Sequence, residues 1–118
     1  MPLEGYRDLI VWQKSMALVA EVYQLTAKYP KTEIFGLVSQ SRRCAVSIPS
    51  NIAEGRTRGS RKDFRQFLII AQASGAELET QIELAKNLKF LSAQDSEKAE
   101  AVLLEVMKML SSIIKKLS

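Results

Sequence analysis

The chain has no histidine and one cysteine among its 118 residues, with only five glycines and three prolines. Without histidine it cannot form Ser-His-Asp or Cys-His nucleophile systems, and it lacks the commonest ligand of mixed zinc sites. A single cysteine excludes an internal disulfide and is typical of a reducing compartment. We therefore expect a cytoplasmic protein that is not an enzyme and holds no metal or cofactor.

Long apolar runs are also absent. No run approaches the roughly 18 apolar residues that a membrane-spanning helix needs. The first residues, MPLEGYRD, include an acid and lack the apolar stretch of a signal peptide. With 47% hydrophobic and 25% charged residues, the composition predicts one globular domain over residues 1–118, with no membrane partner. The few glycines and prolines argue against an all-β or disordered chain.

Apolar residues at three- and four-residue spacing predict four helices. The first begins near Arg7 or Asp8 and ends before Pro30. It carries two apolar stripes about 100° apart, and these are Leu9, Trp12, Met16, Val19 and Tyr23, then Val11, Leu18, Val22, Leu25 and Tyr29. We assign the first stripe to the core. The second is either a self-association surface or the edge of a wide core stripe.

The second predicted helix has Thr32 as its N-cap and ends at Gly55. Its apolar face consists of Leu37, Val38, Ser41, Cys44, Ala45, Ile48 and Ile52. Pro49 predicts a kink inside this helix, because proline lacks an N–H and crowds the preceding turn. Asn51 is expected to satisfy backbone groups that Pro49 frees, and Cys44 to act as a small buried apolar side chain.

Two Ser-x-x-Asp sequences predict the starts of the third and fourth helices, at Ser60 and at Ser92. Their core positions are Phe64, Leu68, Ala71, Gly75, Leu78, Ile82 and Ala85, then Ala99, Leu103, Val106, Leu110, Ile113 and Leu117. Beside the core positions of the third helix lie three more apolar residues, Ile69, Ile70 and Ala73. This is more apolar surface than one core needs and suggests self-association. Four amphipathic helices with short connections predict an all-α fold, an up-down-up-down four-helix bundle.

The basic residues are unevenly placed. Residues 40–65 hold seven of the 17 Lys and Arg side chains and two of the 13 acids. The net charge of this segment is therefore more positive than that of the whole chain, which is +4. Six of the seven are arginine, whose planar guanidinium suits phosphate or carboxylate. This pattern indicates an anionic partner, nucleic acid first. The candidate binding residues are Arg42, Arg43, Arg56, Arg58, Arg61, Lys62 and Arg65.

The last five of these surround a glycine-bracketed turn before a helix N-terminus, where free N–H groups favour anions. The alternative is a solvated loop in which Glu54 and Asp63 pair locally. Arg42 and Arg43 either extend the basic surface or pair with acids of a neighbouring helix or subunit. Those acids, expected to be solvated or interfacial, are Glu77, Glu79 and Glu83. They form no di-iron type of site, which needs Glu-x-x-His pairs.

Several motifs resemble the family of bacterial 23S ribosomal RNA intervening-sequence proteins, and the resemblance covers nearly the whole chain. The motifs are Tyr6-Arg7-Asp8-Leu9, Phe35-Gly36-Leu37, Gln40 to Arg43, Ser47 to Gly55 (SIPSNIAEG), Asp63-Phe64, Phe67-Leu68 and Glu77-Leu78-Glu79. The resemblance implies a four-helix bundle and a ring-like homo-oligomer, a pentamer. The accessory variability proteins of diversity-generating retroelements, similar in fold, bind nucleic acid and a reverse transcriptase, which makes such an enzyme or another protein a candidate partner.

Two functions therefore fit the sequence. The first is a non-enzymatic, oligomeric bundle that binds nucleic acid, structured RNA first, through the arginine-rich turn. The second is an oligomeric interaction scaffold whose arginines contact subunits or an acidic protein partner, without nucleic acid. The only aromatic residues near the arginines in sequence are Phe64 and Phe67. We therefore expect any nucleic-acid binding to depend on phosphates and to have weak sequence preference.

Overall fold

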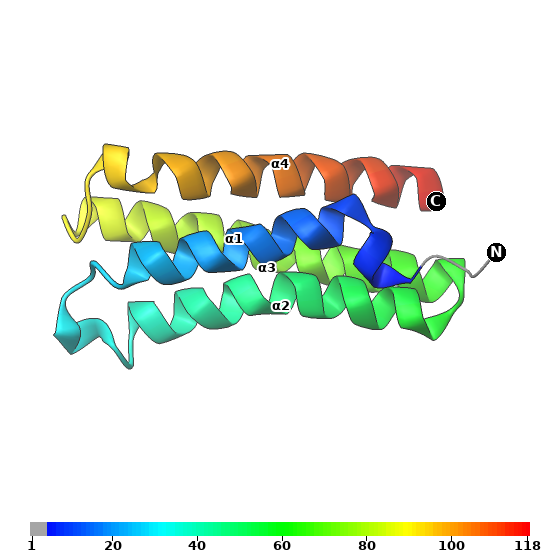
Figure 1. The fold of residues 1–118 in the computed structure, drawn as a ribbon, viewed down its shortest axis with the longest axis horizontal. Helices are drawn as coiled ribbons and strands as arrows, with labels where there is room; N and C mark the ends of the chain where they lie inside the picture. Colours follow the sequence, from blue (N-terminus) through cyan, green and yellow to red (C-terminus); the bar gives the residue numbers. More distant parts are fainter. Residues whose placement is uncertain (1–4) are drawn as a thin grey trace.

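The computed structural model describes residues 5–118, which fold into four long antiparallel helices (Figure 1). The helices are α1 (Ile10–Thr26), α2 (Leu37–Arg58), α3 (Arg61–Asn87) and α4 (Ala93–Leu117), with short 3₁₀ helices at Tyr6–Asp8 and Lys31–Glu33. Each helix packs against its two neighbours, α1 against α2 and α4, and α3 against α2 and α4. The predicted all-α, up-down-up-down four-helix bundle is confirmed.

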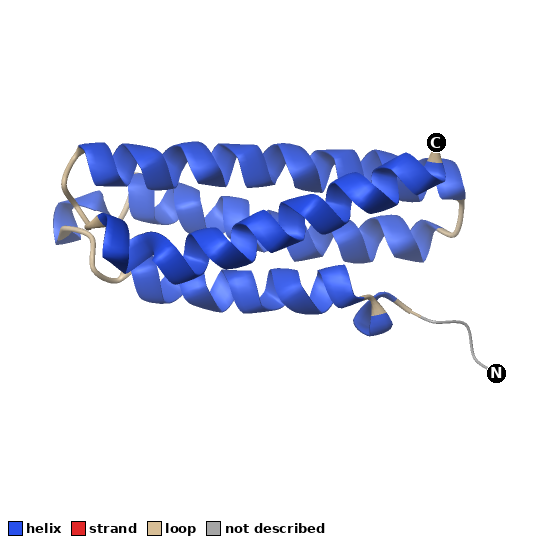
Figure 2. Cartoon of the chain, turned by 90° about the horizontal axis from the view of Figure 1, so that it is seen from above, coloured by secondary structure: helices blue, strands red, loops and turns tan. Residues whose placement is uncertain are grey.

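The bundle is a rod of 48 × 22 × 22 Å. Figure 2 shows the helices running side by side along the rod, with only short loops between them. The start of α1, the C-terminus and the α2–α3 turn lie at one end of the rod, and the α1–α2 and α3–α4 connections lie at the other (Figure 1). No helix within residues 5–118 is long and apolar enough to cross a membrane. Residues 1–4, part of the segment judged not to be a signal peptide, lie outside the described residues.

The core stripe of α1 is only partly the predicted one, since Leu9, Trp12 and Val19 of that stripe pack half-buried against the core. Val11, Leu18, Val22, Leu25 and Tyr29 are buried, whereas Met16 and Tyr23 from the stripe assigned to the core are exposed. Both stripes are apolar, and the choice between them depends on how α1 rotates against α2 and α4. The prediction of self-association through the buried stripe is therefore wrong, and the alternative prediction, a wide core stripe on this helix, is confirmed.

The second helix begins and ends later than predicted. Thr32 lies in the 3₁₀ helix, and α2 starts at Leu37, whose N–H donates to the Glu33 side chain at 3.3 Å. At the other end, Gly55 is buried inside the helix, and the left-handed C-cap is Gly59, with φ +90°. Either glycine could adopt the left-handed conformation that ends a helix, but only Gly59 lies where the chain must reverse.

Pro49 is buried within α2, which continues as one helix through it. The Asn51 amide donates to the Ser47 carbonyl at 2.8 Å. Asn51 therefore bonds to the backbone of this turn, although the carbonyl that Pro49 leaves without an N–H donor is that of Ala45. The predicted apolar face of α2 is buried, except that Leu37 at its edge is only partly buried.

The starts and core faces of α3 and α4 agree with the prediction. Ser60 and Ser92 are N-caps that accept from Asp63 N–H at 3.0 Å and Asp95 N–H at 3.1 Å. Ser92 N–H also donates to Asp95, which completes a capping box and lowers the pKa of that carboxyl. Leu78 of α3 and Leu103 of α4 are among the core side chains that are almost fully buried.

Candidate nucleic-acid interface

The structure divides the predicted basic residues between two places. Arg42 and Arg43 lie in the first turns of α2, whereas the other five lie at the end of α2 and the start of α3. At 1.5 Å per residue along the helix, Arg43 and Arg56 are about 20 Å apart. The seven residues therefore do not form one compact cluster.

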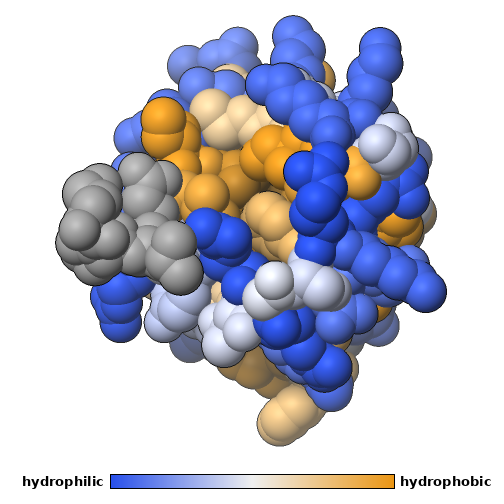
Figure 3. All heavy atoms as spheres, turned by 90° about the vertical axis from the view of Figure 1, so that its right-hand side faces the viewer, coloured by the Kyte–Doolittle hydropathy of each residue, from blue (hydrophilic) through white to orange (hydrophobic). Residues whose placement is uncertain are grey.

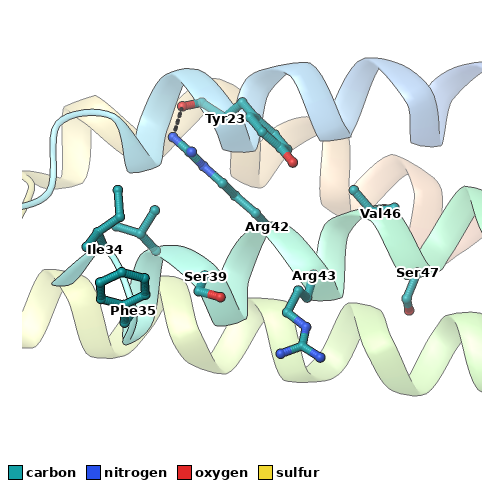
Figure 4. A pocket seen from close by; sticks show the side chains of 9 residues that line it. Tyr23, Ile34, Phe35, Ser39, Arg42, Arg43, Val46 and Ser47 are labelled. Atoms are coloured by element: carbon teal, nitrogen blue, oxygen red, sulfur yellow. Dashed lines mark hydrogen bonds between the residues drawn. The ribbon is translucent and has the colours of Figure 1, made fainter.

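Arg42 binds the end of α1. Its Nε donates to Thr26 Oγ1 at 2.9 Å, and its guanidinium reaches the Tyr23 carbonyl at 3.4 Å. The guanidinium also lies over the Tyr23 ring, 4.5 Å from the ring centroid (Figure 4). A cation at the carbonyl end of a helix is stabilising. Arg42 therefore joins α1 to α2 and is not part of a free basic surface.

Arg43 is exposed and points away from Arg42 (Figure 4). Within residues 5–118 it has no hydrogen bond or ion pair, so the predicted pairing with a glutamate of a neighbouring helix is not made inside the chain. The three candidate glutamates are exposed, and Glu83 pairs with Lys86 at 3.1 Å. Arg43 is therefore available to a partner.

The other five basic residues surround the α2–α3 turn, and we call residues 55–65 the basic turn. Arg58 pairs with Glu54 at 3.2 Å, one helical turn earlier, and more than half of its side chain remains exposed. Lys62 and Arg61 are exposed in the first turn of α3. Because five cations stand against only Glu54 and Asp63 in this part of the chain, the turn keeps an excess of positive charge.

Two arginines of the basic turn hold the end of α4. Arg61 donates to the Lys116 carbonyl at 3.0 Å, and Arg65 Nε donates to the Ile114 carbonyl at 3.2 Å. These carbonyls belong to the last turn of α4, where the helix has no N–H donors of its own. Sequence spacing did not reveal this contact, because the partners are 49 and 55 residues apart. The up-down topology was the available signal, since it brings the end of α4 beside the start of α3.

Arginines also lie over the described aromatic rings at this end. Arg56 is 5.9 Å from the Phe64 ring centroid and Arg58 is 5.0 Å from that of Phe67. The Arg7 guanidinium lies 5.7 Å from the ring centroid of Tyr6 and 5.8 Å from that of Trp12. Figure 3, which faces this end, shows hydrophilic side chains around an apolar centre. A ligand that approaches the rings from outside therefore meets guanidinium groups.

A second feature is an open groove between α1 and α2, near the other end of the rod. We call it the α1–α2 groove; its volume is about 670 Å³, and it is lined by Tyr23, Ile34, Phe35, Val38, Ser39, Arg42, Arg43, Val46 and Ser47. Phe35 is 94% exposed, and Ile34 and Tyr23 are about half exposed. The sequence placed Phe35 only within a motif and did not indicate this exposure, because the residue lies in the α1–α2 connection, outside any helical periodicity.

Polar side chains join α2 and α3 beside this groove. The Ser47 hydroxyl bonds to that of Ser74, and the buried Gln81 amide donates to Cys44 Sγ at 3.5 Å. Burial, and then the negative charge of Glu77, raises the pKa of the Cys44 thiol. Cys44 is 8% exposed and stays a neutral thiol at physiological pH, as a buried apolar residue should.

Comparisons with known proteins agree with this architecture. The family model described as 23S rRNA-intervening sequence protein matches residues 7–112. A crystal structure of a protein of unknown function from the S23 ribosomal protein family of Bacteroides thetaiotaomicron is 28% identical, with a TM-score of 0.80. The match covers 90% of this chain and 99% of the other. A search of curated proteins gave no match.

Proposed function

Since the chain belongs to the 23S rRNA-intervening sequence protein family, we propose that it is a cytoplasmic, non-enzymatic helical-bundle protein that binds structured RNA through the basic turn. The solved relative is itself described as having unknown function, so the proposal rests on the site. The observation that carries it is the excess positive charge at the α2–α3 turn. Arg56, Arg58, Arg61, Lys62 and Arg65 meet there beside the N-terminus of α3.

The arrangement favours phosphate over other anions. A string of phosphates can contact several cations at once, and each contact releases counterions from the nucleic acid. The α3 N-terminus adds a positive dipole end, although Ser60 and Asp63 already occupy part of it. Since these groups recognise charge and not base edges, binding should depend strongly on salt and weakly on sequence.

Removal of Arg58 or Lys62 should weaken RNA binding without unfolding the protein. Arg58→Ala and Lys62→Ala should each reduce the slope of log K against log salt by about one unit, equally for different RNA sequences. Both side chains are exposed, so the melting temperature should change little. Fluorescence anisotropy with a folded RNA hairpin at several salt concentrations gives the slope.

Arg43→Ala is the matched control, because it removes an exposed cation about 20 Å away along α2. It should leave the slope unchanged. If Arg43→Ala lowers the slope while Arg58→Ala and Lys62→Ala do not, the site is not the basic turn. If the wild-type protein binds no RNA at low salt, the proposed function is wrong.

We also propose that the chain is a homo-oligomer, a ring of five subunits as the family resemblance implies. Two opposite faces of the bundle support association between copies. The α1–α2 groove is apolar and carries arginines and no acid. On the α3–α4 side, a hollow is lined by Glu79, Glu83, Glu100, Leu103 and Leu104. Complementary faces on opposite sides of one subunit are suited to head-to-tail contacts, which close into rings.

Phe35→Asp should reduce the mass of the assembly. Phe35 is 94% exposed on the single chain, so a buried carboxylate at the interface would oppose association while the isolated fold remains intact. Light scattering should give several times 13.2 kDa for the wild type and a lower mass for the variant. Ile10→Asp, an exposed apolar site outside the groove, is the control. A wild-type monomer at micromolar concentration would contradict this proposal.

The alternative function, an interaction scaffold that binds no nucleic acid, is supported by the same groove. Arg43, which has no partner within residues 5–118, lines the groove with the exposed Phe35, and the two fit an acidic, apolar protein surface as well as a second copy. The RNA titration separates the two functions, because a scaffold would retain its assembly and show no salt-dependent RNA binding.

A further inference from the structure

The last turn of α4 forms part of the same surface as the basic turn. Arg61 and Arg65 hold its carbonyl groups, as described above, and this places Lys115 and Lys116 beside the α2–α3 turn. Both lysines are exposed, and neither ammonium group has a hydrogen bond or ion pair within the described part of the chain. They therefore add two free cations to the surface, although they are 50 or more residues away in sequence from the basic turn.

The covered rings indicate which form of nucleic acid suits this surface. Proteins that bind single strands stack bases on exposed aromatic rings. Here Tyr6, Trp12, Phe64 and Phe67 are half-buried, and each has a guanidinium within 6 Å of its ring centroid. Unpaired bases would find no free ring among these four. A double helix has its bases already stacked and offers only its backbone to such a surface.

We infer that the end of the bundle binds the sugar–phosphate backbone of double-helical nucleic acid through two arms, the basic turn and the Lys115–Lys116 pair. This inference rests on the proposed function. Packed helices lie about 8–10 Å apart, and long basic side chains extend that span. The span is comparable with the major groove of B-form DNA, about 12 Å wide, and on A-form RNA the wide, shallow minor groove is the one that such a surface can follow. The arms can therefore contact phosphates on both sides of a groove without reading the bases.

The test compares a blunt RNA duplex with its two separated strands, and with a DNA duplex of the same sequence, by fluorescence anisotropy. Lys115→Ala with Lys116→Ala should reduce the salt slope for duplexes by about 1.8, at roughly 0.9 per lost contact. Lys31→Ala with Lys98→Ala is the control, since both lysines are exposed and lie at the other end of the rod. The wild type should bind either duplex more tightly than the single strands.

The outcomes distinguish this inference from the proposed function. If Lys115→Ala with Lys116→Ala binds duplex as the wild type does, while Arg58→Ala binds it more weakly, the end of α4 does not contact the duplex. The basic turn would then remain the binding site. If single strands bind more tightly and Phe35→Ala abolishes that binding, bases stack in the α1–α2 groove, and the inference is overturned. If no nucleic acid binds the wild type, the proposed function itself fails. Lys115→Gln with Lys116→Gln provides a second variant should the alanine pair lose helicity.

Discussion

Leu78→Ala should lower the free energy of unfolding by about 2–5 kcal/mol. Leu78 lies in the middle of α3 and has no exposed surface. The substitution removes apolar contacts and leaves a cavity that the surrounding helices fill only in part. The loss is large against the roughly 5–15 kcal/mol that stabilises a domain of this kind. Chemical denaturation followed by circular dichroism measures it.

Leu88→Ala is the matched control, because Leu88 is 57% exposed at the end of the same helix. Its effect should be on the order of 0.5 kcal/mol. Equal losses for the two variants, or coincident denaturation curves for Leu78→Ala and the wild type, would mean that the register of α3 in the core is wrong.

Gly55→Ala should destabilise the bundle by about 1–3 kcal/mol, although alanine is the better helix former by about 1 kcal/mol. A Cβ at Gly55 would lie 2.6 Å from Phe67 Cβ and 3.4 Å from Phe64 Cδ1. Phe67 Cβ is attached directly to the backbone of α3, so relief requires α2 and α3 to move apart. Thermal unfolding followed by circular dichroism measures the loss.

Gly75→Ala provides the comparison. A Cβ at Gly75 would also be too close to a neighbour, but that neighbour is the sulfur of Met107. Methionine is flexible, and its thioether end can turn aside. Gly75→Ala should therefore stay within about 1 kcal/mol of the wild type, since helix propensity offsets the repacking. A larger loss for Gly75→Ala than for Gly55→Ala would contradict this account of the α2–α3 contact.

Sequence reasoning succeeded where one local rule determines the structure. The Ser-x-x-Asp pattern identified the starts of α3 and α4, because a serine hydroxyl there satisfies an otherwise free N–H. The strict spacing around Leu78 identified the core face of α3, because apolar and small residues recur there at three- and four-residue steps without interruption. The architecture followed from the number of such helices and their short connections.

It failed where several local solutions compete. The first helix has two apolar stripes, and the tertiary contacts bury the one around Leu18 and leave Met16 exposed. Gly55 and Gly59 both fit a helix end, and the position of the turn selects Gly59. The site was found only in part for a related reason. Charge counting identified the basic turn, but the contacts of Arg42 with α1, and of Arg61 with α4, depend on helices distant in sequence.

The salt dependence of RNA binding by the wild-type chain tests the central claim most directly. The affinity for a structured RNA is measured by fluorescence anisotropy over a series of salt concentrations. We predict a linear fall of log K with log salt, with a slope between about −4.5 and −6.3 for five to seven phosphate contacts at roughly 0.9 each. We also predict nearly the same slope for RNAs of different sequence. No binding at low salt, or binding with little dependence on salt, would contradict the claim.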